Sequence, residues 1–303
     1  MRNSYRIGVD VGGTRLRLIA QRTADGRRTV PVEIPVPRSV GDMVTQIGAL
    51  ARTAVGDAAI ESLGVGLPGQ VLDGRCVWVP NLRFLDGQPL ADALASHVGA
   101  PCHLVNDAQA TLVAEATEGA AKGFADVVLL AVGTGIGGAY QVGGQIVQGA
   151  NGCAGAFGWL SFPGASRDAD HGQWERVGSG LHLEELAEDW GGTSALLTAA
   201  RRGDRRARRT VDDFAAVLGQ GAAALASILD PDIIVFAGGF VSAFDLLADA
   251  LKGAVFRHGS PAGGKVPIVP AALGSAAGVI GALTWAGIAG TNLPGAGAQE
   301  VQR

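Results

Sequence analysis

Two glycine-rich turns of similar design have the composition of phosphate-binding loops. The first glycine turn, Asp10-Val11-Gly12-Gly13-Thr14, follows the apolar segment Ile7–Val9. The second glycine turn, Gly133-Thr134-Gly135-Ile136-Gly137-Gly138, follows the apolar segment Val127–Val132. Paired glycines let backbone N–H groups approach an anion, and a threonine hydroxyl adds a donor. Two such turns in one chain predict the two halves of a nucleotide site.

Charged side chains accompany the first glycine turn. A carboxylate at the end of a strand in a phosphate site binds Mg²⁺ directly or through water, and Asp10 has that position. Arg17 is close enough in sequence to contact the same phosphates. The alternative for this segment is an ordinary hairpin turn, because many β-turns contain Asp and Gly.

The pair Asn106-Asp107 is a candidate catalytic element. It stands between the predicted strand His103–Val105 and the predicted helix Asp107–Thr117. An aspartate at the start of a helix often serves only as a cap. Facing bound phosphate, it can instead act as a general base that accepts the proton of an attacking hydroxyl, and Asn106 would hold a neighbouring hydroxyl.

Composition and charge exclude several classes of function. The chain has 303 residues, of which 48% are hydrophobic, and a net charge of −4. An acidic balance argues against a nucleic-acid partner. Three isolated cysteines suit a reducing cytoplasm, and we expect neither a leader peptide nor a membrane-spanning segment. The arginine-rich run 201–209 is predicted to be a solvated loop between helices.

The order of elements predicts two related α/β lobes. Strand, glycine turn, strand and helix recur twice along the chain, as predicted for residues 1–115 (a small lobe) and 116–275 (a large lobe). A helix at about 276–290 is expected to return to the small lobe, and residues 291–303 to form a flexible tail. Val177–Asp189 is predicted to be a single helix.

An ordered set of motifs resembles the ROK family of sugar kinases, which includes bacterial glucokinases. The matching motifs are Asp10–Thr14, Gly66–Gly69, Pro80–Leu82, Asn106–Ala108, Gly133–Gly138 and Asp230–Gly239, and the resemblance spans about residues 5–288. It implies the two-lobed, actin-like ATPase fold with the active site in the interlobe cleft. It further implies Asp107 as the base, Pro68, Gly69, Asn81 and Asn106 as sugar contacts, and Gly238-Gly239 at the adenosine. On its own, Gly238-Gly239 is equally compatible with a plain strand-to-helix turn.

The chain departs from the family pattern in the sugar and zinc segment. The family resembles A-G-E-x-G-H here, whereas this chain reads Ala154-Gly-Ala156-Phe-Gly-Trp159, so that a sugar-binding Glu and a His are replaced. The later cysteine-rich loop lacks its cysteines, and we therefore expect no structural zinc. Glu175 matches the family's second sugar-binding Glu, although a solvated carboxylate at a helix start is the alternative. Loss of the acceptor at Ala156 predicts altered specificity.

The leading interpretation is an ATP- and Mg²⁺-dependent hexose kinase that phosphorylates the 6-hydroxyl of a glucose-like sugar. An amino sugar such as kanosamine is a candidate substrate by chemical fit, and an ordinary glucokinase is the alternative. Polyphosphate as donor remains open, although Gly238-Gly239 favours ATP. A sugar-responsive repressor is disfavoured because the chain begins at the nucleotide lobe, and a non-catalytic sugar sensor is disfavoured by Asp10, Asn106 and Asp107. The resemblance also implies a homodimer, and the isolated cysteines predict a cytoplasmic location.

Overall fold

The structure is a computed structural model that describes residues 4–161 and 171–289. All predicted site residues fall within these ranges, whereas the predicted tail 291–303 lies outside them. The contacts between residues divide the chain into two compact units. Unit 1 comprises Met1–Ala114 and Ala276–Arg303, and unit 2 comprises Glu115–Ser275.

The secondary structure is mixed α/β. The strands are β1 (Ser4–Val11), β2 (Arg15–Arg22), β3 (Val32–Pro35), β4 (Ala59–Leu67), β5 (Gln70–Leu72), β6 (Arg75–Trp78), β7 (Cys102–Asn106), β8 (Val127–Val132), β9 (Ile136–Val142), β10 (Gln145–Ile146), β11 (Ile233–Ala237) and β12 (Ile268–Pro270). The α-helices are α1 (Val40–Val55), α2 (Leu90–Val98), α3 (Asp107–Thr117), α4 (Gln173–Gly178), α5 (Gly180–Leu186), α6 (Thr193–Arg201), α7 (Arg205–Leu229), α8 (Phe244–His258) and α9 (Ala277–Ile288).

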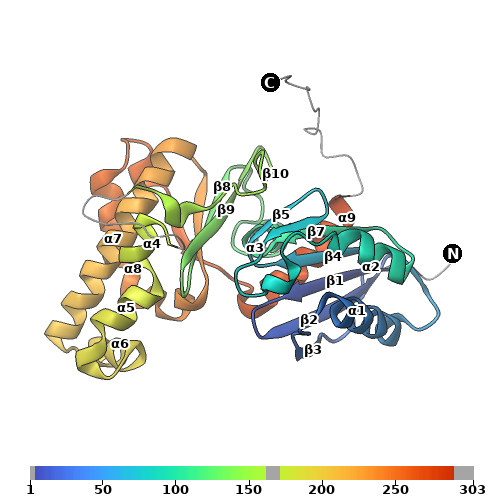
Figure 1. Cartoon of the computed structure of the whole chain (residues 1–303). Coiled ribbons are helices and arrows are strands. Elements are labelled where there is room, and N and C mark those ends of the chain that lie inside the picture. The colour runs from blue at the N-terminus through green and yellow to red at the C-terminus, as the bar shows by residue number, and fades with distance from the viewer. Residues whose placement is uncertain (1–3, 162–170, 290–303) are drawn as a thin grey trace, which may run out of the picture. The chain divides into compact units, whose positions relative to one another are not determined.

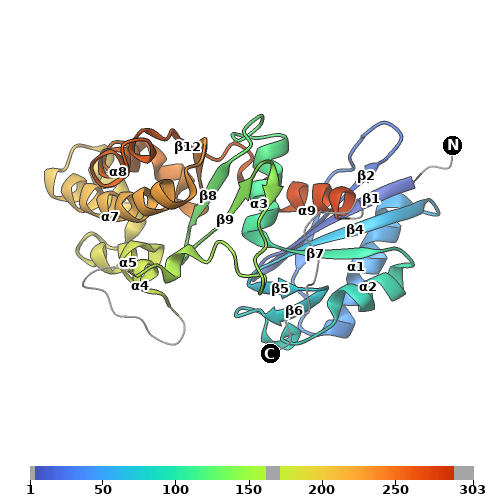
Figure 2. The same ribbon diagram turned by 90° about the horizontal axis from the view of Figure 1, so that it is seen from above.

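Unit 1 contains a five-stranded sheet in the order β3-β2-β1-β4-β7. Strands β1, β4 and β7 are parallel to one another, and β2 and β3 extend the sheet as an antiparallel meander. Helices α1 and α2 cover one face, where alternate residues of β1 such as Ile7 and Val9 form the main core. Helix α9 covers the opposite face (Figure 2).

Helix α9 lies unusually close to the sheet because glycines face it. A Cβ atom on Gly8 of β1 would lie 2.6 Å from the Leu283 Cβ, and one on Gly64 of β4 would lie 1.9 Å from the Ala282 carbonyl oxygen. Helices α3 and α9 are equally close, since a Cβ on Gly281 would lie 1.7 Å from the Ala110 carbonyl oxygen. The small residues that make α9 apolar all round therefore permit backbone-level packing on the sheet and on α3.

Unit 2 contains a second five-stranded sheet in the order β10-β9-β8-β11-β12. Its strands β8, β11 and β12 are parallel, and β9 and β10 are antiparallel additions. The core of this unit joins β8 and β11 to α7 and α8, with Phe214 and Leu218 of α7 buried among them. Figure 1 shows these long helices on one side of the sheet.

Two sequence predictions about unit 2 are wrong. The predicted helix Val177–Asp189 is broken at Ser179, whose extended backbone caps α5 through its Oγ. The arginine-rich run is not all loop, because α7 begins at Arg205. Asp204 accepts the Ala207 N–H at 2.8 Å and starts that helix. Arginines in the first turns of α7 then pair with acidic residues one turn further on.

Helix α7 also has the length and composition of a membrane-spanning helix. It covers 25 residues, and 56% of its most apolar window is buried inside the structure. A helix of this kind is equally typical of the core of a globular unit, where its apolar stripe packs against a sheet. Its packing on β8 and α8 supports that second interpretation.

Candidate active site

The predicted site residues of unit 1 meet at one edge of its sheet. Asp10 lies opposite Gly66 in the register of β1 with β4, and Leu67 lies opposite Asn106 in the register of β4 with β7. Because the three strands are parallel, their carboxyl ends share an edge. This edge carries Asp10, the Pro68-Gly69 turn and Asp107.

Asp10 is largely enclosed on the α9 side of the sheet. A Cβ on Gly278, in the first turn of α9, would lie 2.8 Å from the Asp10 Cγ. Burial raises the pKa of Asp10 above its ordinary value, while the nearby Arg17 guanidinium opposes that shift. The Arg17 Nε itself donates to Glu33 at 2.7 Å. Arg17 is thus held between two carboxylates, of which Asp10 is the more buried.

The first glycine turn leaves its polar groups accessible. The Gly12 N–H donates to the Arg15 carbonyl at 2.8 Å and closes the turn. Gly13 and Thr14 are exposed to solvent. A Cβ on Gly13 would lie 3.8 Å from the Cβ of Asn81, which is also exposed. The predicted phosphate turn and the predicted sugar contact Asn81 are therefore neighbours.

Asn106 fastens two segments of this edge together. Its Nδ2 donates to the Gly69 carbonyl at 2.7 Å, and its Oδ1 accepts the N–H groups of Ala108 and Gln109 at 2.9 and 3.3 Å. It is the cap of α3 as well as the anchor of the Pro68-Gly69 turn. Gly69 has φ +90, and a Cβ there would lie 2.2 Å from the Trp78 carbonyl oxygen. Only glycine fits that turn.

Asp107 occupies the first position of α3 and has the electrostatics of a base that is half ionised just below neutral pH. The residue as a whole is exposed, but the protein atoms packed around its carboxyl group displace water from it. This desolvation raises the pKa of Asp107 to about 6. The N–H of Ala108, which donates to Asp107 Oδ1 at 2.8 Å, opposes the shift, and the Asp10 carboxylate adds to it. The two acidic side chains therefore lie close enough to influence each other.

The second glycine turn, in unit 2, is held by the start of α5. The carbonyls of Gly133 and Thr134 accept the N–H groups of Gly180 and Leu181 at 2.7 and 3.3 Å. In a trans peptide the C=O and the following N–H point in opposite directions. The N–H groups of Thr134 and Gly135 consequently face away from α5, as an anion-binding turn requires.

Gly238-Gly239 lies at the same edge of the unit 2 sheet. Ala237 of β11 is paired with Ala131 of β8, so the two loops that follow these strands are adjacent. Gly238 has φ +90, and a Cβ there would lie 2.3 Å from the Val132 carbonyl oxygen. Both glycines are exposed. Their backbone is open to a ligand beside the second glycine turn.

The altered sugar segment is accessible and adjoins Glu175. Ala156 is exposed, and the indole of Trp159 is 44% exposed. A Cβ on Gly158, between them, would lie 2.7 Å from a Glu175 carboxylate oxygen, and one on Gly135 would lie 2.4 Å from the other. Glu175 thus lies between the segment that carries Trp159 and the second glycine turn.

A comparison with known protein families gives a match over most of the chain. The sequence profile of the ROK family matches residues 6–288. The chain belongs to the ROK family. It is 33% identical over 285 residues to the bifunctional enzyme NanE/NanK of Brucella melitensis biotype 1, covering 91% of this chain and 52% of that enzyme. The chain therefore spans about half the length of that relative.

Two further relatives match over nearly their whole length. The glucokinase of Halalkalibacterium halodurans is 30% identical over 321 residues, covering 93% of this chain and 94% of that enzyme. A ROK family glucokinase from Streptomyces griseus, crystallised with glucose and AMPPNP, is 28% identical, with a TM-score of 0.74 and coverage of 94% and 99%. The prediction of a ROK protein with a two-lobed, actin-like α/β fold is confirmed.

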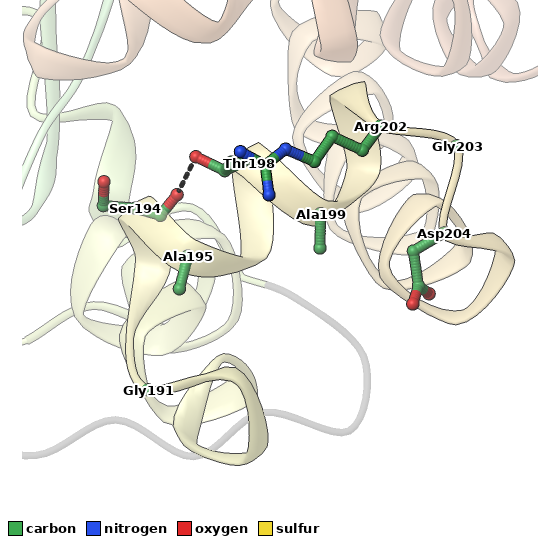
Figure 3. A pocket seen from close by; sticks show the side chains of 8 residues that line it. All are labelled: Gly191, Ser194, Ala195, Thr198, Ala199, Arg202, Gly203 and Asp204. Carbon is green, nitrogen blue, oxygen red and sulfur yellow. Dashed lines mark hydrogen bonds between the residues drawn. The ribbon is translucent and has the colours of Figure 1, made fainter.

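Among residues 4–161 and 171–289, no three or more His, Cys, Asp or Glu side chains gather as a metal site would require. His171 lies within these ranges, and residues 162–170 of the expected zinc region lie outside them. A surface hollow along α6, lined by Ser194, Thr198, Arg202 and their neighbours, contains none of the predicted site residues (Figure 3).

The sequence reasoning missed the contacts of Asp10 and of the base of α3. Gly278 lies in the predicted helix at about 276–290, and its missing side chain makes room for the Asp10 carboxylate. Glu115 lies in the predicted helix Asp107–Thr117 and is completely buried. The sequence feature that could have indicated this burial is a carboxylate placed among apolar residues on one side of a helix.

Proposed function

We propose that this ROK-family sugar kinase transfers the γ-phosphoryl group of ATP to the 6-hydroxyl of a glucose-like sugar. The observation that carries the proposal is Asp107, a carboxylate with a pKa of about 6 at the start of α3, beside Asp10 and the Asn106–Gly69 bond. A base of that pKa is ionised at neutral pH and still able to accept a proton.

Each site residue has a separate role in the proposed phosphoryl transfer. Asp107 accepts the proton of the sugar hydroxyl, whose oxygen attacks the γ-phosphorus. The bond from that phosphorus to the bridging oxygen breaks, and ADP leaves. The outward N–H groups of the second glycine turn and the first glycine turn with Thr14 bind phosphate oxygens. Gly238-Gly239 admits the adenosine. The exposure of Gly13 and Thr14 in the first turn, and of Thr134 in the second, supports the proposal.

Mg²⁺ suits the acidic pair of unit 1. Asp10 is a half-buried carboxylate, and a second acidic side chain, Asp107, lies close to it. Mg²⁺ in such sites takes one or two protein carboxylates, while water and phosphate oxygens complete its coordination shell. Asp10 would hold the ion, directly or through water, and the ion would neutralise phosphate charge. Arg17 adds positive charge to the same place.

The sugar is proposed to differ from glucose at the position that faces Ala156 and Trp159. An exposed alanine supplies no acceptor, and an exposed indole supplies an apolar face with one donor. Asn81 and Glu175 remain to bind hydroxyls. An amino sugar, for example one with nitrogen at carbon 3 as in kanosamine, fits this set. An ordinary glucokinase is the second candidate, supported by the S. griseus structure.

A sugar panel tests the proposal. ADP release from ATP is measured with glucose, mannose and 2-amino, 3-amino and N-acetyl sugars, and with polyphosphate in place of ATP. We expect turnover with ATP and a kcat/KM for one amino sugar above that for glucose. If glucose is preferred, the enzyme is an ordinary glucokinase. Sugar binding without any turnover would favour a non-catalytic sensor and refute the kinase.

A homodimer in the cytoplasm is proposed on the resemblance and on the cysteines. Cys76, Cys102 and Cys153 are free thiols, as a reducing compartment would leave them. Light scattering of the purified chain measures the oligomeric state. A single mass equal to one chain would contradict the dimer.

A further inference from the structure

We propose that Glu115 is a positioning residue that holds the end of helix α3 to the segment leading into helix α9, and so sets the spacing of Asp107 and Asp10. This inference rests on the proposed role of Asp107 as the base. Glu115 itself is placed at the opposite end of α3 from the reaction and touches no reacting atom.

Glu115 is a completely buried carboxylate that binds three backbone N–H groups. Its Oε2 accepts the N–H of Ala120 at 2.7 Å and that of Ala272 at 3.1 Å, and its Oε1 accepts the N–H of Leu273 at 2.9 Å. No basic side chain pairs with it in the described residues. Burying a carboxylate costs free energy unless its oxygens accept hydrogen bonds. The three backbone donors therefore compensate for the burial of Glu115.

The three bonds lie where the chain passes between the two units. One passage is between Ala114 and Glu115, and the other is between Ser275 and Ala276. Glu115 begins unit 2 on the first passage, and its bonds to Ala272 and Leu273 reach the segment just before the second. A single carboxylate therefore ties the two connecting segments together within unit 2.

Both connecting segments lead directly to an acidic site residue. Helix α3 runs without a break from Glu115 back to Asp107, a distance of about 12 Å at the rise of an α-helix. The second segment enters α9, whose Gly278 lies against the Asp10 carboxyl. Helices α3 and α9 are themselves locked by the contact of Gly281 with Ala110. A displacement at Glu115 is therefore expected to reach Asp107 along α3, and to reach Asp10 through the contact of α3 with α9.

Two variants, called the tie variants below, weaken the three hydrogen bonds of Glu115 in different ways. Glu115→Gln keeps the size of the side chain but replaces one acceptor with an N–H₂ group that faces backbone donors. Gly119→Ala keeps Glu115 and displaces its carboxylate, because the new Cβ would lie 2.0 Å from Oε2. Glu118→Gln is the matched control, since Glu118 is exposed and lies three residues further along. At least one variant is expected to fold, because the second changes a single methyl group.

The experiment has two readouts that do not depend on the substrate. Hydrogen exchange measures protection of the Ala120, Ala272 and Leu273 amides. NMR titration of ¹³C-labelled carboxyls, with Asp107→Asn used for assignment, measures the pKa of Asp107. We expect both tie variants to lose amide protection and to move the Asp107 pKa away from about 6 toward that of an isolated carboxyl. Glu118→Gln should resemble the wild type.

Kinetic measurements separate the positioning role of Glu115 from the proposed kinase function. With an active sugar, the tie variants should lose about tenfold or more in kcat, while both KM values change by less than about twofold. Lost amide protection with an unchanged Asp107 pKa and unchanged kcat would overturn the positioning role. If the wild-type enzyme phosphorylates no sugar, the proposed function fails, and the NMR titration still decides whether Glu115 positions Asp107.

Discussion

Acid is expected to inactivate the enzyme with a midpoint near pH 6, because Asp107 must be ionised to accept a proton. The pKa of Asp107 is raised to about 6 by burial and, to a smaller extent, by the Asp10 carboxylate. About nine tenths of the molecules therefore carry the ionised base at pH 7 and about one tenth at pH 5, so kcat/KM for the sugar should fall roughly tenfold between them. A carboxyl with the ordinary value of 3.8 would keep about nine tenths of its activity at pH 5.

The assay is kcat/KM for the sugar at saturating ATP and Mg²⁺, measured from pH 4.5 to 8. Asp10→Asn provides an internal control, because removing the neighbouring charge should lower the midpoint while also lowering activity. Asp107→Asn should lose at least about a thousandfold in kcat, near the middle of the range for a general base. A midpoint below pH 5 in the wild type would refute the assignment of Asp107.

The same pKa has a consequence for stability. Between pH 3.8 and about 6 the folded chain binds more protons at Asp107 than the unfolded chain, so stability falls as the pH rises through this window and stays lower above it. Asp107→Asn should therefore raise the free energy of unfolding at pH 7.5. The shift corresponds to about 3 kcal/mol at face value, and since the side chain is exposed we expect about 1 kcal/mol or less. Urea unfolding measures it.

Three further predictions follow from the site geometry. Gly238→Ala should raise the KM for ATP about tenfold with little change in sugar binding, because φ +90 and the Val132 carbonyl leave no room for a Cβ; initial-rate kinetics would show an unchanged KM if this is wrong. Ala156→Glu restores an acceptor on an exposed position and should raise kcat/KM for glucose relative to the preferred sugar; a lower ratio in the sugar panel would contradict the specificity proposal. Asn106→Ala should cost about 1–2 kcal/mol of stability by removing the α3 cap and the bond to Gly69, and an unchanged urea midpoint would contradict that role.

Motifs allowed much of unit 1 to be predicted from the sequence. In α1, for example, Ser39 stands just before a helical apolar pattern, and its side chain accepts the Asp42 N–H as a helix cap. The family and the two-lobed fold were likewise within reach, because an ordered set of glycine turns and Asn106-Asp107 is specific even though each part is weak. The roles of the individual site residues stay predictions.

The features that could not be predicted from the sequence depend on contacts between segments that are distant along the chain. Ser179 interrupts a helical pattern because the start of α5 is needed at the second glycine turn, which no local periodicity records. Arg205 enters a helix because Asp204 caps it and acidic residues one turn later compensate the charge. Glu115 and Gly278 are explained only once α3 and α9 are seen packed together.

The close packing of α9 on the sheet of unit 1 has a consequence for how the protein is made. Unit 2 is one continuous stretch of chain, whereas the sheet of unit 1 is synthesised first and receives α9 only after all of unit 2 has left the ribosome. Until then Gly8 and Gly64 lack the helix that packs on them, and that part of the sheet face is uncovered. The first unit is therefore completed only by the last described helix of the chain, and the part of its sheet under α9 stays uncovered while unit 2 is synthesised.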